Sequence, residues 1–429
     1  MTEILEKSKS QKLSRNLLCL GSNFETIPFI RFCQENGFTC HVCDPSPNSP
    51  GKEHADVSVD IDATDTESLK EYCKKHTIST IVLGVADQLV SAYATLCSDL
   101  GIPGYATNEN ARIFSSKHEF NKLLIKNNLL PIPGYSVSLP KLDNQIDNII
   151  KNSKPPWIVK PTDSVSGKGL FVVDDAHLLK NFVIKSMVFS NQKIILIEKL
   201  IRSPEVSLYF NMNSTDFSYI LSDKYSANTG LGNVTSLQVY PSKSSKLIEG
   251  QIIKNFKSIF KQQQIDKGVL LISAFVDNDT FYWYDPGFRL QGEPSDVHEF
   301  FHLGSKSYAN LLSIACSDFN EPAFNYKSKT GVSATIWFLL NPGKISAILG
   351  FEKLADQDNV LEIRQRLNVG DIVKYDDIGT EKQVFSRVCI WSKDREELKN
   401  CIKRIRKNCR IEDENGVNLL LKLNDWQKL

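Results

Sequence analysis

The first hundred residues alternate between short apolar runs and amphipathic segments, and this alternation constrains the fold more than any other feature. The apolar runs are typical of buried strands, and the segments between them carry a helical repeat. Parallel strands need a crossover connection, which is usually a helix. The pattern therefore predicts a doubly wound parallel sheet. The predicted strands are 16–23, 38–44 and 78–84, and the predicted helices are 26–37, 65–76 and 90–101.

Gly21 follows the first predicted strand, where a dinucleotide-binding chain would begin its glycine fingerprint. The segment "GSNFET" lacks the second and third glycines, so a pyrophosphate could not approach the start of the helix closely. A nicotinamide enzyme is therefore disfavoured.

The composition describes a folded chain of more than one structural unit. A chain of 429 residues exceeds what one hydrophobic core usually holds. The 51 basic and 50 acidic residues nearly cancel, so we expect no nucleic-acid partner. The first sixteen residues are too polar for a signal peptide, and no apolar run approaches the roughly 18 residues of a membrane span. With ten scattered cysteines, we expect free thiols and a cytoplasmic protein without a membrane partner.

Two pairs of residues have the spacing of metal ligands. Cys40 and Cys43 form a CxxC, but they lie in a predicted strand, where positions i and i+3 point to opposite faces. His298 and His302 lie four apart, which fits a helical metal pair, but no third ligand accompanies them. We interpret both pairs as ordinary side chains.

The segment "PWIVKPTDSVSGKGLFVV" (156–173) predicts a hairpin with a glycine-rich loop. Gly167, Lys168 and Gly169 would offer bare N–H groups and an ammonium at the loop, with Lys160 at its base. This chemistry is typical of a phosphate cradle, and an ordinary solvated hairpin is the alternative that these residues alone leave open.

The rest of the chain mixes strands and helices. We expect helices at 115–128, capped by Ser115 or Ser116, and at 175–188, 247–263 and 395–408, the last burying Leu398, Cys401, Ile402 and Ile405. We expect strands at 193–201 and 206–213, a hairpin at 268–285 turning at Asn278 and Asp279, and short strands in "SATIWFLL" and "KISAILGF". The segment 222–230 is predicted as a substrate loop that carries Lys224 toward an acceptor.

Three motifs resemble the ATP-grasp superfamily of carboxylate ligases, which includes the carbamoyl phosphate synthase large chain and amino-acid ligases. They are "WIVKPTDSVSGKG", "IEKLIRSPE" and "DPGFRLQGE", and the resemblance runs from about Asn16 to the C-terminus. It implies a fold of mixed α/β and α+β character. Residues 1–112 would form a Rossmann-like domain, 113–328 the two-lobed ATP-grasp domain, and 329–429 a barrel-like α+β domain.

The resemblance also implies which residues bind ATP. Lys160 and Lys168 would neutralise the phosphates, the Glu198 to Ile201 segment would receive adenine, and Glu205 would accept the ribose hydroxyls. Lys168 would also serve catalysis. The full implied nucleotide set is Lys117, Lys160, Ser166, Gly167, Lys168, Glu198, Lys199, Ile201 and Glu205.

The predicted metal strand departs from the family pattern Glu-x-Asn-x-Arg. Here the same spacing gives Asp285, Gly287 and Arg289. Asp285 would bind Mg²⁺, whereas Gly287 has no side chain. Ser273 and Ala274 stand where the family usually has another glutamate. Three explanations stay open. Asp285 and water could hold a single Mg²⁺, other segments could supply the missing ligands, or the ATP-grasp domain could have lost catalysis.

Arg289 would grip the carboxylate or acyl-phosphate oxygens, as a catalytic residue. Alternatively it could pair with Asp285 or Glu293.

The implied reaction is an ATP-dependent carboxylate–amine ligation through an acyl phosphate, releasing ADP and phosphate. The partners would be a small-molecule carboxylate and an amine, and family members often pair as homodimers. Two alternatives stay open: a nucleotide-binding sensor or scaffold without ligase turnover, and a relative that acts on bicarbonate-derived intermediates.

Overall fold

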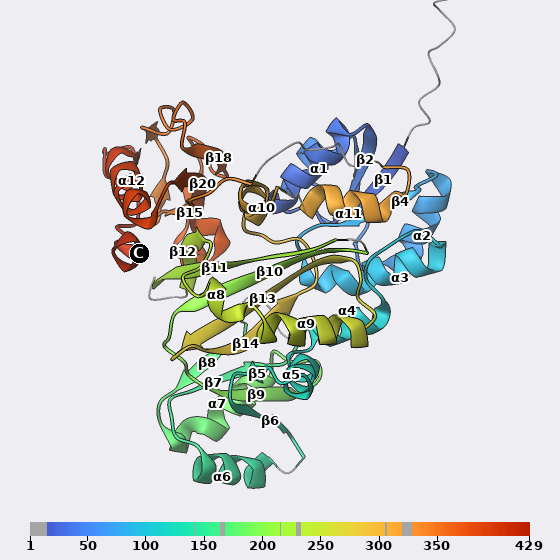
Figure 1. Cartoon of the computed structure of the whole chain (residues 1–429), viewed down its shortest axis with the longest axis vertical. Helices are drawn as coiled ribbons and strands as arrows, with labels where there is room; N and C mark the ends of the chain where they lie inside the picture. The colour runs from blue at the N-terminus through green and yellow to red at the C-terminus, as the bar shows by residue number, and fades with distance from the viewer. Residues whose placement is uncertain are drawn as a thin grey trace, which may run out of the picture.

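The computed structural model describes residues 15–140, 142–163, 168–214, 216–228, 233–304, 307–319 and 328–429. Three bodies surround one long sheet, which crosses the middle of the molecule (Figure 1). In this view the N-terminal elements lie at the upper right, the C-terminal elements at the upper left, and the small sheet of the central region at the bottom. Within the described residues, no helix is both long and apolar enough to cross a membrane.

The N-terminal sheet is parallel, as the alternating pattern predicts. Its strand order is β3-β2-β1-β4. Helices cover the strands, which explains why Leu17 to Leu20 are fully buried. The three-residue strand β3 was not predicted. The elements are β1 (Arg15–Leu20), α1 (Ile27–Glu35), β2 (Phe38–Cys43), β3 (Val57–Val59), α2 (Thr66–Lys75), β4 (Thr80–Leu83) and α3 (Val90–Leu100).

The small sheet of the central region contains the predicted hairpin. Strands β7 (Trp157–Pro161) and β8 (Phe171–Val173) pair antiparallel, with Trp157 opposite Val173. Trp157 and Val159 pack into the core beneath helices α6 and α7, so Lys160 lies on the opposite face. The sheet order is β6-β9-β7-β8. The remaining elements are β6 (Gly134–Ser138), α6 (Leu142–Asn152), α7 (Leu179–Met187) and β9 (Ile194–Lys199).

The long sheet has nine strands in the order β18-β20-β15-β12-β11-β10-β13-β14-β5. It crosses the predicted boundary at residue 328, because β15 pairs with β12 through Ile336 and Leu237. The domain boundaries at residues 112 and 328 stay a prediction. The strands are β5 (Leu130–Pro131), β10 (Glu205–Asn213), β11 (Asp216–Asn228), β12 (Asn233–Tyr240), β13 (Gly268–Asp277), β14 (Thr280–Gly287), β15 (Val332–Leu339), β18 (Val360–Gln365) and β20 (Val384–Ser392).

The prediction of a substrate loop at 222–230 was wrong for residues 222–228. This stretch belongs to β11, which pairs with β10 on one side and β12 on the other. The polar composition of this segment did not indicate a strand. Its backbone groups are hydrogen-bonded to neighbouring strands, and a pattern within the segment does not reveal those partners. Residues 229 and 230 lie outside the described part of the chain.

Several helices match their predictions closely. Ser116, rather than Ser115, caps α5, since its side chain accepts from the Glu119 N–H. The turn at Asn278 and Asp279 has both residues at positive φ, as a tight hairpin requires. The other elements are α4 (Asn108–Ser115), α5 (Lys117–Lys126), α8 (Ser245–Ile248), α9 (Gln251–Gln262), α10 (Ser295–Leu303), α11 (Ser307–Ala315), β16 (Gly343–Lys344), β17 (Ala347–Leu349), β19 (Ile372–Val373), α12 (Arg395–Asn408) and β21 (Arg410–Glu412).

Candidate functional site

Lys160 and Glu198 form a buried ion pair on the inner face of the small sheet. The Lys160 Nζ atom lies 2.6 Å from Glu198 Oε2. Only 3% of the Glu198 side chain and 13% of the Lys160 side chain are exposed. The pairing of β7 with β9 places Glu198 opposite Ile158, two residues from Lys160 along the strand. A carboxylate buried this deeply needs a partner, and the lysine supplies it.

Tyr284 connects the small sheet to the long sheet. The Lys160 ammonium lies 5.8 Å from the centre of the Tyr284 ring. The Tyr284 hydroxyl donates to Glu205 Oε1 at 2.7 Å, and the ring stacks on Phe275. Burial, followed by the Glu205 charge, raises the pKa of Tyr284 far above its ordinary value, so the phenol stays a donor. The sequence analysis did not identify Tyr284.

Lys224 lies opposite Glu205 across the β10–β11 pair. Its Nζ atom is 3.0 Å from Glu205 Oε1, the same oxygen that accepts from Tyr284. Burial by itself lowers the pKa of Lys224, but the charges of Glu205 and Glu293 outweigh it and raise the pKa above its usual value. The ammonium is therefore charged at neutral pH.

A β-bulge interrupts the pairing of β13 with β14 at Asp285. Tyr284 pairs with Ser273 and Pro286 pairs with Ile272, so Asp285 is left without a partner on the neighbouring strand. Asp285 has φ +50°, a left-handed conformation that aspartate tolerates better than most residues. Its side chain is 63% exposed, and Oδ1 lies 3.5 Å from Lys117 Nζ.

These residues fit one magnesium ion but not two. Mg²⁺ in nucleotide sites is usually held by one or two carboxylates together with phosphate oxygens, and Asp285 is one such carboxylate. Ser273 lies opposite Tyr284 without a carboxylate, and Ala274 is packed into the core on the other face. In the described ranges, no group of three acidic, histidine or cysteine side chains could hold a metal ion.

Gly287 leaves room for an ion pair between distant segments. Arg289 donates to Asp87 Oδ2 at 2.6 Å and to the Leu290 carbonyl at 2.7 Å. A side chain at Gly287 would place its Cβ 3.3 Å from Asp87 Oδ1. Arg289 thus pairs with neither Asp285 nor Glu293. Asp87 follows β4 at the carboxyl edge of the first sheet, where such sheets usually bind ligands, and that position was a signal the sequence analysis did not use.

A cavity of about 950 Å³ lies between α5 and the small sheet. Leu196, Glu198 and Lys199 of β9 line one wall, and the segment from Leu130 to Ser136 lines another. This size is in the range of small-molecule sites. The Lys199 N–H already donates to the Pro133 carbonyl at 2.9 Å, so it is not available to an adenine ring. No bond from the Ile201 N–H to another described residue is present.

The glycine-rich loop is described only in part. Ser166 and Gly167 lie outside the described residues. Lys168 is exposed at the point where the description resumes. Gly169 has φ +74°, and a Cβ there would lie 2.8 Å from Phe189 Cβ. Only glycine fits this position without strain.

His298 and His302 hold β15 rather than a metal. His298 contacts the hydroxyls of Ser333 and Thr335, both at 2.7 Å, and His302 contacts Ser333 at 2.9 Å. Burial lowers the pKa of both histidines, that of His302 to about 4. Cys40 and Cys43 are buried free thiols. The contacts of His298 and His302 are those of buried side chains that bind hydroxyls, and the interpretation of Cys40 and Cys43 stays a prediction.

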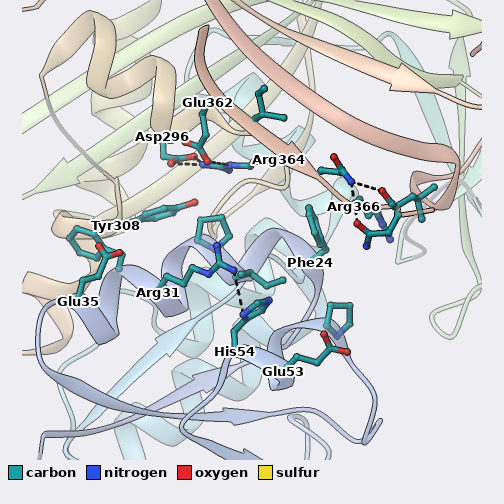
Figure 2. Close-up of a pocket in the computed structure, with 18 of the residues that line it drawn as sticks. Phe24, Arg31, Glu35, Glu53, His54, Asp296, Tyr308, Glu362, Arg364 and Arg366 are labelled. Atoms are coloured by element: carbon teal, nitrogen blue, oxygen red, sulfur yellow. Dashed lines mark hydrogen bonds and ion pairs between the residues drawn. The ribbon is translucent and has the colours of Figure 1, made fainter. Parts of the chain in front are cut away.

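A second cavity, of about 690 Å³, lies between α1 and β18 (Figure 2). Arg31 and His54 line its N-terminal wall, 3.4 Å apart. On the opposite wall Arg364 is bound by Asp296 at 2.8 Å and by Glu362 at 2.6 Å. None of the predicted site residues lines this cavity, so it lies apart from the Lys160–Tyr284–Glu205 contacts.

Sequence comparison relates part of the chain to a known enzyme. No family model matches the sequence. A segment of 175 residues, 41% of the chain, is 22% identical to the carbamoyl phosphate synthase large chain of Clostridium acetobutylicum, and it spans only 16% of that protein.

Solved structures resemble nearly the whole chain. Phosphoribosylglycinamide synthetase from Anaerococcus prevotii has a TM-score of 0.76 at 16% identity, covering 94% of this chain and 100% of that one. L-amino acid ligase from Bacillus licheniformis has a TM-score of 0.73 at 15% identity, and the match covers 94% of this chain and 99% of that one. A third match is the biotin carboxylase domain of Hydrogenobacter thermophilus 2-oxoglutarate carboxylase, a dimer solved with MgADP and bicarbonate. Its TM-score is 0.74 at 14% identity, and the match covers 93% of this chain and 90% of that one. The chain therefore has the ATP-grasp fold that these ligases and carboxylases share.

Proposed function

We propose that this chain is an ATP-dependent ligase that joins a carboxylate to an amine. The observation that carries the proposal is the series of contacts from Lys160 through Tyr284 to Glu205 and Lys224. These contacts gather charged groups from both sheets where the motifs place the nucleotide. A site of this kind suits a polyanionic ligand held between two lobes.

The reaction proceeds in two steps. A substrate carboxylate oxygen attacks the γ-phosphorus of ATP, which gives an acyl phosphate and ADP. The amine nitrogen then attacks the acyl carbon, the bond from that carbon to the phosphate oxygen breaks, and the nitrogen loses a proton. The products are an amide, ADP and phosphate. Activation is necessary because a free carboxylate has no adequate leaving group.

The residues of the chain supply position and charge. Lys160 and Lys168 neutralise phosphate oxygens. Glu205 accepts hydrogen bonds from the ribose hydroxyls, and the segment from Glu198 to Ile201 lies against the adenine ring. Since the Lys199 N–H is occupied, Ile201 supplies the backbone donor. A magnesium ion held by Asp285 would neutralise further phosphate charge.

Arg289 binds the substrate carboxylate or the acyl phosphate. Its planar guanidinium is aligned by Asp87, which leaves part of the fork for a second anion. The Arg289 Nε atom is buried and has no partner in the described part of the chain. This donor supports a role in binding an anionic group.

The test is ADP release measured across a panel of carboxylates and amines, together with ATP binding by calorimetry. We expect ADP release that requires one carboxylate and one amine. Lys160→Met should abolish ATP binding, whereas Lys246→Met, on the exposed side of α8, should leave it unchanged. A wild-type chain that binds no ATP would contradict the proposal.

A second candidate is a nucleotide-binding protein without ligase turnover. The specific observation in its favour is the bulge at Asp285, which leaves Tyr284 rather than a carboxylate opposite Ser273. Tight ATP binding without ADP release over the whole panel would favour this candidate over the ligase.

We further propose a cytoplasmic protein that forms a homodimer. The pairing of the biotin carboxylase domain named above supports the dimer. Light scattering of the purified chain distinguishes a dimer from a monomer.

A further inference from the structure

Strand β13 carries Ser273 and Ala274 where the family usually has another glutamate. Ser273 and Tyr284 pair across β13 and β14. Glu205 contacts Tyr284, and its Oε1 atom already accepts a hydrogen bond from the Tyr284 hydroxyl and lies 3.0 Å from Lys224 Nζ. A carboxylate neutralised in this way is a poor ligand for a divalent cation.

Lys224 brings a fixed positive charge to the same face. An ammonium has three N–H donors. Glu205 is the partner of Lys224 among the described residues, which leaves two donors for another acceptor. The side chain is only 20% exposed, so water satisfies these donors poorly. A buried ammonium with unused donors indicates an anionic ligand.

Tyr284 keeps this ammonium in place. Its hydroxyl and the Lys224 ammonium share Glu205 Oε1, and its ring is fixed by stacking on Phe275 with centres 5.0 Å apart. The ring also faces Lys160, which the motifs place on the nucleotide phosphates. Lys160 and Lys224 are therefore both linked to Tyr284, Lys160 over its ring and Lys224 through the shared Glu205 oxygen.

We propose that the Lys224 ammonium binds phosphate oxygens of the nucleotide in the place of a second divalent cation, so that the chain binds nucleotide with one divalent cation, at Asp285. This inference rests on the proposed nucleotide binding. It assigns to β11 a positive charge that the sheet supplies by itself, without a metal.

The first experiment counts bound cations. Mn²⁺ replaces Mg²⁺, and electron paramagnetic resonance measures the number of Mn²⁺ ions bound per chain at saturating ADP. We expect one. Two bound Mn²⁺ ions per chain would overturn the inference while leaving nucleotide binding intact.

The second experiment removes the ammonium without leaving a buried carboxylate unpaired. Lys224→Met is combined with Glu205→Gln, and ADP affinity is measured by calorimetry in EDTA. Relative to Glu205→Gln alone, we expect the double variant to lose about tenfold to hundredfold in affinity, as expected for a lost hydrogen bond to a charged group. Lys224→Arg in the wild-type background should retain most of the affinity.

The outcomes separate this inference from the proposed function. Equal affinity of the double variant and Glu205→Gln would show that Lys224 only neutralises Glu205, and the inference fails. If the wild-type chain binds neither ATP nor ADP, the proposed function fails first. Thermal unfolding of each variant shows whether it is folded.

Discussion

Arg289 donates to Asp87 at 2.6 Å across 202 positions of sequence, and this ion pair ties the end of β14 to the carboxyl edge of the first sheet. Burial by itself lowers the pKa of Arg289, but the Asp87 carboxylate raises it above its ordinary value. The pair thus brings a charged guanidinium from the long sheet against the N-terminal body.

Replacing Arg289 by lysine should reduce turnover far more than nucleotide binding. Lysine keeps the charge but loses the planar fork that can bind Asp87 and a substrate anion together. We expect turnover to fall roughly a hundredfold, the scale of removing one preorganised donor. Steady-state kinetics and ATP calorimetry check this. Arg112→Lys, in a surface pair with Glu109, is the matched control. Unchanged turnover in Arg289→Lys would remove Arg289 from the mechanism.

Replacing Lys160 by methionine should destabilise the fold as well as abolish nucleotide binding. The substitution leaves Glu198 as an uncompensated buried charge, which costs about 3–5 kcal/mol. Lys160→Met combined with Glu198→Gln should recover most of this stability, because no buried charge remains unpaired. Urea unfolding of the two variants measures the difference. Equal free energies of unfolding would show that the pair is not buried in solution.

Stability should fall as the pH drops from about 6.5 to about 4, in part because of His302. Its folded-state pKa is lowered to about 4, whereas an unperturbed histidine has a pKa of about 6.5. In that window the unfolded chain takes up a proton that the folded chain does not, so acid favours unfolding. Urea unfolding of wild type and His302→Gln across this range isolates the contribution. We expect a shallower pH dependence in the variant, and parallel curves would contradict the assignment.

Replacing Gly169 by alanine should cost more than the same change at Gly101. Both glycines have positive φ, +74° and +64°. Alanine in this left-handed conformation costs about 1–2 kcal/mol of stability at either position. A Cβ at Gly169 also meets Phe189 at 2.8 Å, whereas nothing lies within 4 Å at Gly101. Thermal unfolding measures the difference. Equal losses in the two variants would mean that Phe189 moves away at no cost.

Local patterns predicted many elements well. The helix at 395–408 begins and ends as expected, with Leu398, Cys401, Ile402 and Ile405 on its buried face. The turn at Asn278 and Asp279 and the hairpin from Trp157 to Val173 also agree. Each depends on residues close in the sequence, so its cause is visible there. Strand β11 was missed because its polar residues lie in a strand that pairs with β10 on one side and β12 on the other.

The sequence by itself determined the alternation of strands and helices, the hairpins and the residue types of the predicted nucleotide site. Only the tertiary structure decided which of those residues meet. The bulge at Asp285 turns its carboxylate toward Lys117 and leaves Tyr284 beside Glu205 and Lys224, and the ion pair of Arg289 with Asp87 joins two sheets. Strand register and contacts between distant segments depend on the packing of the whole chain. A shift of one residue in a strand moves a side chain to the other face, and no local pattern determines that choice.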